Sequence, residues 1–129
     1  MTLVVSRRVV LVVEDDDGMR EALQTLLGAA GFGNASYPSA EAMLAEGTQE
    51  GTLCVITDIN LPAMSGLGLL TELRKRGSQL PVIVITAFES PAARREAERL
   101  GAVAYLPKPF LSRALLTALE SISGHCAPG

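Results

Sequence analysis

Short aliphatic runs alternate along the chain with longer segments in which apolar residues recur every three or four positions. Runs dominated by aliphatic residues occupy positions 9–13, 53–57 and 82–86. Short continuous apolar runs are typical of strands that are buried on both faces of a parallel sheet. Segment 102–106 is predicted as a fourth such strand, and the weaker segment 33–37 as an edge strand.

The segments between these strands are predicted to form helices. Apolar residues recur at helical spacing over residues 19–30 and again over residues 111–122. Three further helices are each preceded by a serine whose hydroxyl can accept a hydrogen bond from the first turn: Ser39, Ser65 and Ser90. Each predicted strand is therefore followed by a predicted helix.

Five such units with short connections predict an α/β fold of the doubly wound type, a (βα)5 sandwich around a parallel five-stranded sheet. Strand order 2-1-3-4-5 is the common solution, and its functional crevice opens at the carboxyl ends of strands 1 and 3. A length of 129 residues fits one domain. We expect that domain over residues 1–124, with its core at about 8–123, and a flexible tail or the start of a linker at 125–129.

Composition narrows the class of protein. A hydrophobic content of 48% with a net charge of only −3 argues against disorder. A sequence pI near 5.1 argues against direct nucleic-acid binding through a basic face. Cys54 lies in an apolar run and Cys126 in the tail, which indicates thiols and no disulfide framework. With no signal-peptide core and no membrane-length apolar run, a cytoplasmic protein without a membrane partner is predicted.

The acidic residues suggest a metal site. A run of four acids, 14–17, follows the first strand, and Asp58 follows the third. Strands 1 and 3 are neighbours in the predicted sheet, so these carboxylates converge and repel one another unless a cation is bound. Mg²⁺, or Mn²⁺, suits such oxygen ligands. Acids at a helix start are also favoured by the helix dipole alone, the interpretation we prefer for Asp16 and Asp17.

Two further strands deliver polar side chains to the same edge. The fourth strand ends in Thr86, and the fifth is followed by Lys108 between two prolines, which restrict the backbone. An ammonium, a hydroxyl and carboxylates around a metal form a site suited to a phosphoryl group, where catalysis consists mainly of positioning and charge neutralisation. Phosphoryl chemistry at this edge is therefore predicted.

Taken together, these motifs resemble a known family. Val-Val-Glu-Asp-Asp at 12–16, Asp-Ile-Asn-Leu-Pro-Ala-Met-Ser-Gly at 58–66, Val-Ile-Thr-Ala at 84–87 and Lys-Pro-Phe at 108–110 occur in this order. The chain resembles the receiver domain of bacterial two-component response regulators over about residues 8–123. This resemblance implies a CheY-like, flavodoxin-like version of the predicted fold. Any one motif would be weak, whereas all of them at the expected strand ends are specific.

The resemblance also implies roles for the acidic residues. Asp58 matches the phospho-acceptor, which takes a phosphoryl group from a phosphohistidine and forms an acyl phosphate. Asp15 matches the direct Mg²⁺ ligand, Glu14 its neighbour, and the backbone carbonyl of Asn60 a further ligand. Because four acids stand in a row, Asp16 remains an alternative for the metal pair, one residue out of register.

The remaining matches concern the switch that follows phosphorylation. Thr86 matches the hydroxyl that moves to the phosphoryl oxygen, and Lys108 the ammonium that pairs with the phosphate. The Lys108–Pro109 bond is a candidate cis peptide. Tyr105 matches the aromatic residue that rotates inward as Thr86 moves, although an ordinary edge-strand aromatic would look the same in sequence.

The resemblance further implies partners. A sensor histidine kinase or a phosphotransfer protein would be the phosphodonor, and the chain would be a signalling phospho-acceptor and not a conventional enzyme. The face formed by helix 91–100, the fifth strand and the last helix would form a homodimer or dock a partner after phosphorylation. A simply solvated helix 91–100 is the alternative, because its outer face is charged.

Three other functions fit the sequence less well. An aspartyl phosphatase or phosphotransferase would need a second acid where Asn60 stands, together with a cap domain. A flavin- or nucleotide-binding protein would need a glycine-rich loop after the first strand, which this chain lacks. A degenerate receiver that acts only as a docking module would lack Asp58, Thr86 or Lys108, and all three are present.

Overall fold

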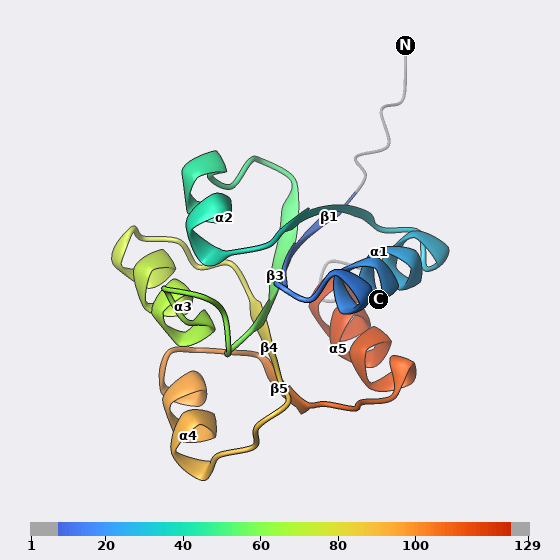
Figure 1. Cartoon of the computed structure of the whole chain (residues 1–129). Coiled ribbons are helices and arrows are strands. Elements are labelled where there is room, and N and C mark those ends of the chain that lie inside the picture. Colours follow the sequence, from blue (N-terminus) through green and yellow to red (C-terminus); the bar gives the residue numbers. More distant parts are fainter. Residues whose placement is uncertain (1–7, 125–129) are drawn as a thin grey trace.

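The computed structural model describes residues 8–124, in which five parallel strands alternate with five helices. The elements in chain order are β1 Val9–Val13, α1 Asp17–Ala29, β2 Gly33–Tyr37, α2 Ala40–Glu46, β3 Thr52–Asp58, α3 Gly66–Lys75, β4 Val82–Thr86, α4 Pro91–Arg99, β5 Ala104–Pro107 and α5 Ser112–Gly124. The strands form one sheet in the order β2-β1-β3-β4-β5 (Figure 1), so the predicted fold class and strand order are confirmed.

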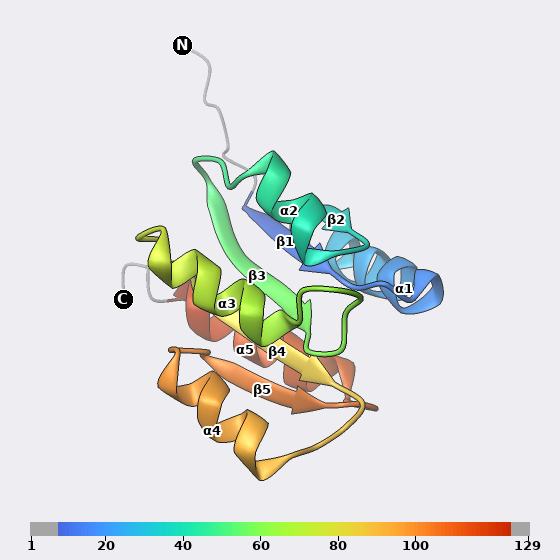
Figure 2. The same ribbon diagram turned by 60° about the vertical axis from the view of Figure 1, so that its left-hand side comes forward.

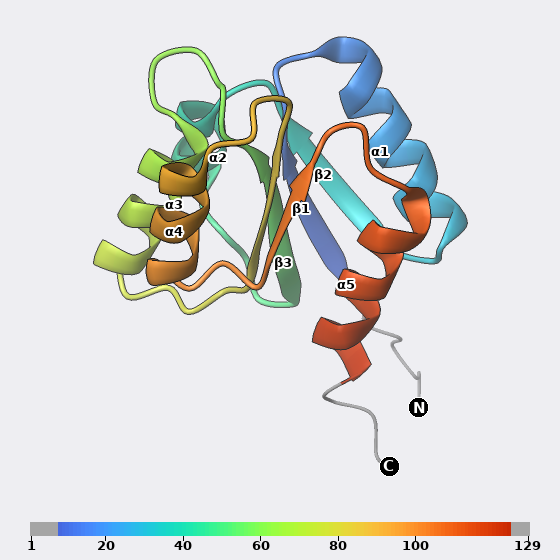
Figure 3. The ribbon, with the colours of Figure 1, turned by 90° about the horizontal axis from the view of Figure 1, so that it is seen from below.

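The helices cover both faces of the sheet. Helices α2, α3 and α4 lie on one face, and α1 and α5 lie on the other (Figure 3). The layers explain the continuous aliphatic runs, because successive side chains of a strand point to opposite faces. In β1, Leu11 and Val13 pack in the cluster beneath α2–α4, whereas Val10 and Val12 pack in the cluster with α1 and α5.

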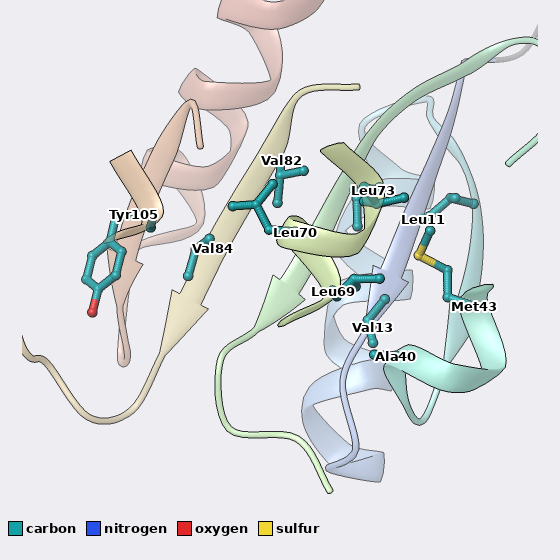
Figure 4. Close-up of a cluster of buried hydrophobic side chains, with 12 residues drawn as sticks. Leu11, Val13, Ala40, Met43, Leu69, Leu70, Leu73, Val82, Val84 and Tyr105 are labelled. Carbon is teal, nitrogen blue, oxygen red and sulfur yellow. The ribbon is translucent and has the colours of Figure 1, made fainter. Parts of the chain in front are cut away.

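Both hydrophobic clusters extend across the strands. Figure 4 shows the cluster on the α2–α4 side, in which Leu69, Leu70 and Leu73 of α3 pack over the sheet. Tyr105 lies at the β5 end of this cluster, with its hydroxyl directed away from the other labelled side chains. Cys54 belongs to the opposite cluster, where burial raises the pKa of its thiol to about 12. It is a free, buried thiol, as predicted.

Side-chain caps set the starts of four helices. Ser39, Ser65 and Ser90 each accept a hydrogen bond from the backbone N–H three residues later, at 3.0–3.2 Å. These caps confirm the predicted helix starts. Asp16 does the same for α1 by accepting from Met19 N at 2.8 Å. The α1 helix therefore begins at Asp17, two residues before the apolar periodicity that predicted it.

The fifth strand differs from its predicted bounds. It spans Ala104–Pro107, whereas the apolar pattern indicated 102–106. Ala102 N donates to Ala97 O and so closes the end of α4, and Val103 N donates to Val82 O before the strand begins. The predicted tail at 125–129 lies outside the described residues, as does Cys126. Within residues 8–124, no helix is long and apolar enough to cross a membrane.

Candidate functional site

The strand register brings the predicted site residues to one edge of the sheet. Val13 pairs with Thr57, so the residues that follow them, Glu14 and Asp58, stand side by side. On the other side of β3, Asp58 pairs with Ile85, the residue before Thr86. Figure 2 shows the arrowheads of β3, β4 and β5 at this same edge, from which the loops that carry the polar side chains emerge.

Lys108 joins the two buried carboxylates. Its Nζ donates to Asp58 Oδ2 at 2.7 Å and to Glu14 Oε1 at 2.9 Å. The side chains of Glu14 and Asp58 are only 1% and 6% exposed, and that of Lys108 is 16% exposed. One ammonium thus faces two carboxylates, which leaves the cluster with an excess of negative charge.

Burial and charge act in opposite directions at these groups. Burial raises the pKa of Glu14, and the hydrogen bonds from Asp16 N–H and Lys108 offset only part of that rise. Burial alone would lower the pKa of Lys108, but its hydrogen bonds to Asp58 and Glu14 and their negative charges raise it overall. Lys108 is therefore held as an ammonium at neutral pH.

Three acids fit a divalent cation. Glu14, Asp15 and Asp58 each offer one carboxylate oxygen, and these oxygens lie within 4.8 Å of one another. Hard cations such as Mg²⁺ take oxygen ligands of this kind. Asp16, the alternative one residue out of register, instead uses its carboxylate to cap α1. Asn60 is also adjacent, because its backbone N–H donates to Asp58 Oδ1 at 2.9 Å.

A glycine keeps the backbone of Asp58 in place. Gly66 begins α3, and its N–H donates to Ile59 O at 2.9 Å. A Cβ at this position would lie 2.1 Å from the carbonyl oxygen of Asp58, far inside van der Waals contact. Only glycine therefore permits this approach of helix to strand. In the sequence, Gly66 stands out only as the last residue of a motif, and this packing role was not predicted.

The loop between Asp58 and Gly66 is tethered from α2. Met64 N donates to Glu41 Oε2 at 2.9 Å, across 23 residues of sequence. The preceding residue, Ala63, has a φ of 59°, in the left-handed region that non-glycine residues rarely adopt. This role of Glu41 was not predicted, because nothing in a solvated helix pattern indicates which loop a carboxylate contacts.

Thr86 lies at the edge, but its hydroxyl contacts its own loop. Thr86 Oγ1 accepts from Phe88 N at 3.1 Å and donates to Phe88 O at 3.2 Å. The backbone links Thr86 to the lysine, because Lys108 N donates to Thr86 O at 2.6 Å. The Lys108–Pro109 peptide bond is cis.

Tyr105 is buried, with its side chain under α4. The residue is only 8% exposed, and its hydroxyl has no hydrogen-bond partner among the residues that the structure describes. The guanidinium carbon of Arg94 lies 4.4 Å from the centroid of its ring. The sequence pattern of this helix left a solvated outer face and a docking face as alternatives, and neither predicted the contact of Arg94 with Tyr105.

The comparison with known families agrees with this geometry. Residues 10–120 match the model of the response regulator receiver domain. The chain belongs to this family. Its fold is the CheY-like form of the flavodoxin fold, as the resemblance implied. The response regulator receiver protein from Pseudoalteromonas atlantica superposes with a TM-score of 0.86 at 25% identity, covering 91% of this chain and 98% of that one.

Curated relatives of this receiver domain are longer proteins. The transcriptional regulatory protein FixJ of Azorhizobium caulinodans is 39% identical over 116 residues, which are 90% of this chain and 55% of FixJ. The response regulator protein FleR of Pseudomonas aeruginosa is 45% identical over 107 residues, 83% of this chain and 23% of FleR. The chain thus spans about half of one relative and about a quarter of the other.

Proposed function

We propose that this receiver domain accepts a phosphoryl group on Asp58 from a phosphohistidine of a sensor histidine kinase or a phosphotransfer protein. One observation carries the proposal. The nearly buried carboxylate of Asp58 is held by Lys108 Nζ and Asn60 N–H, beside Glu14 and Asp15, at the edge where strands 1 and 3 of a doubly wound sheet open.

The proposed step is an in-line transfer. A carboxylate oxygen of Asp58 attacks phosphorus, a new P–O bond forms and the P–N bond to the partner's imidazole breaks. The electron pair of that bond returns to the imidazole nitrogen, which takes up a proton. The Lys108 ammonium, 2.7 Å from Asp58 Oδ2, balances negative charge on the phosphoryl oxygens.

We further propose that Glu14, Asp15, Asp58 and the carbonyl of Asn60 hold Mg²⁺ or Mn²⁺. A divalent cation there would neutralise charge and orient phosphoryl oxygens. The excess of carboxylates over ammonium groups supports this assignment, because like charges that close together are costly without a cation. The role of Asp16 in this proposal is to cap α1.

The proposed switch involves Thr86 and Tyr105. The Thr86 hydroxyl leaves the backbone of Phe88 to bond a phosphoryl oxygen, and the α4–β5–α5 face repacks as a two-state element. That face then forms a homodimer or docks a partner. We assign these roles to a cytoplasmic receiver domain over residues 1–124 that contacts neither nucleic acid nor membrane itself.

The test is phosphorylation in solution. The protein is incubated with Mg²⁺ and acetyl phosphate, and its intact mass is measured. Wild type should gain one phosphoryl group, whereas Asp58→Asn and samples treated with a chelator should not. No adduct on wild type would overturn the proposal and favour a degenerate receiver that serves only as a docking module.

A further inference from the structure

The buried position of Tyr105 is not explained by hydrogen bonding. Its hydroxyl is buried and has no partner among residues 8–124. A phenol oxygen that loses water without gaining a partner is destabilised. Other contacts must therefore stabilise the inward orientation of the ring. One charged group lies against the ring: the guanidinium carbon of Arg94 of α4 is 4.4 Å from the ring centroid.

Arg94 is itself held from the loop between β4 and α4. Its Nη2 and Nε donate to Glu89 Oε2 at 3.0 and 3.3 Å. Glu89 directly follows Phe88, whose backbone N–H and C=O both bond the Thr86 hydroxyl. An unbroken series of contacts therefore runs from Thr86 through this loop to Arg94 and the ring of Tyr105.

From this geometry we infer that Arg94 is a positioning residue that, braced by Glu89, holds Tyr105 in its buried orientation. The inference deepens the proposed function and rests on it for its regulatory meaning. Arg94 covers one face of the ring through a cation–π contact.

The consequence is a link between the loop and the switch aromatic. When the Thr86 hydroxyl leaves Phe88, the loop that carries Glu89 loses two hydrogen bonds to it. A movement of this loop reaches the ring of Tyr105 through the Glu89–Arg94 pair. The populations of Tyr105 orientations thus depend on Arg94 as well as on Thr86.

The test measures the exposure of Tyr105 directly. The chain has two tyrosines, so 3-fluorotyrosine labelling gives two fluorine resonances, which Tyr37→Phe assigns. The shift of each resonance between H₂O and D₂O reports its exposure to solvent. The measurement uses the full chain without phosphodonor and compares wild type with Arg94→Ala, Arg94→Lys and Glu89→Gln.

Arg95→Ala is the matched control. Arg95 neighbours Arg94 on the same helix, is exposed and makes no ion pair within the described part of the chain. Arg94→Ala should raise the ratio of exposed to buried Tyr105 about fivefold, the change that corresponds to about 1 kcal/mol of cation–π energy. Glu89→Gln should raise this ratio by less. Arg94→Lys should keep part of the burial that Arg94→Ala loses.

Equal Tyr105 exposure in Arg94→Ala and Arg95→Ala would overturn the inference. The Tyr37 resonance reports whether each variant is folded, and Glu89→Gln repeats the test with a milder change. The same samples are then incubated with Mg²⁺ and acetyl phosphate and weighed by mass spectrometry. If wild type is phosphorylated but Arg94→Ala leaves the exposure of Tyr105 unchanged, the positioning role of Arg94 alone is refuted. If wild type gains no phosphoryl group, the proposed function alone is refuted.

Discussion

Asp15, Asp16 and Asp58 have the same side chain but different surroundings. Asp58 is buried between Lys108 and the backbone of Asn60. Asp15 is exposed and contributes an oxygen to the same cluster, while Asp16 caps a helix. Burial beside a cation distinguishes the proposed nucleophile from the other two, and the order of the strands produces that burial.

The charge of Lys108 is predicted to stabilise the fold as well as to bind phosphate. Lys108→Met leaves Glu14 and Asp58 facing each other without an ammonium. In the presence of a chelator at about pH 7, the free energy of unfolding should fall by about 2 kcal/mol, less than for a fully enclosed pair because the lysine is partly exposed. Urea denaturation measures the change.

The pH dependence of that variant follows from the sign of the Glu14 shift. The pKa of Glu14 is already raised by burial, and Lys108 is one of the groups that lower it. Without Lys108 the pKa of Glu14 rises further above its unfolded value. The contribution of protonated Glu14 to the free energy of unfolding is then fully present below the pKa of Glu14 in the unfolded chain. It is lost as the pH rises through the pKa of Glu14 in the folded protein. The loss of unfolding free energy in Lys108→Met should therefore be smaller at about pH 5 than at about pH 7. Lys75→Met, which removes an exposed lysine at the end of α3, is the control. A loss in Lys108→Met that is the same at both pH values and equals that of the control would contradict this prediction.

At the scale of elements, the junction of β3 and α3 determines the geometry of the site. The amino end of α3 approaches the carbonyl of Asp58 at Gly66, and the intervening loop is fixed by Glu41 from α2. The acceptor is thus held at the end of a buried strand by a helix start and a tether. Flexible side-chain packing alone would not fix the backbone so closely.

Two glycine substitutions test this junction. Gly66→Ala places a Cβ 2.1 Å from Asp58 O, so strand and helix must separate. It should destabilise the protein by about 1–3 kcal/mol and slow phosphorylation of Asp58. Gly28→Ala in α1 is the control, because its Cβ meets nothing within 4 Å. Gly28→Ala should raise the free energy of unfolding by about 0.5–1 kcal/mol, measured by thermal unfolding. Similar effects of Gly66→Ala and Gly28→Ala would refute the claim that α3 packs on Asp58 only with glycine at position 66.

The elements were largely predictable from sequence because their signals are local. Apolar runs identified the strands, and serine caps identified three helix starts. The β5 boundary was wrong by two residues at its start, since it depends on hydrogen bonds from Ala102 and Val103 to distant segments. The contact of Arg94 with Tyr105 was equally invisible, because it depends on how α4 packs against β5.

At the scale of the whole molecule, the proposed switch would be read on the α4–β5–α5 face. The two hydrophobic clusters on opposite faces of the sheet give a rigid base, to which the loops at the carboxyl edge are attached. Asp58, Thr86 and Lys108 could be placed at this edge from sequence, because each stands at the end of a predicted strand or directly after one.

A change of assembly is the predicted response of the whole molecule. Beryllofluoride with Mg²⁺ mimics an acyl phosphate at Asp58. Light scattering should then show the mass of wild type rising toward that of a dimer, whereas Asp58→Asn should remain at the monomer mass. An unchanged mass for wild type would contradict dimerisation and leave docking of a different partner as the output.

The central claim, that Asp58 is the phospho-acceptor, is tested most directly by locating the acyl phosphate. Protein phosphorylated with acetyl phosphate and Mg²⁺ is treated with sodium borohydride, which reduces an aspartyl phosphate to homoserine, and is then digested and sequenced by mass spectrometry. We expect homoserine at position 58 and at no other aspartate. Homoserine at position 15 or 16, or none at all in the treated protein, would contradict it.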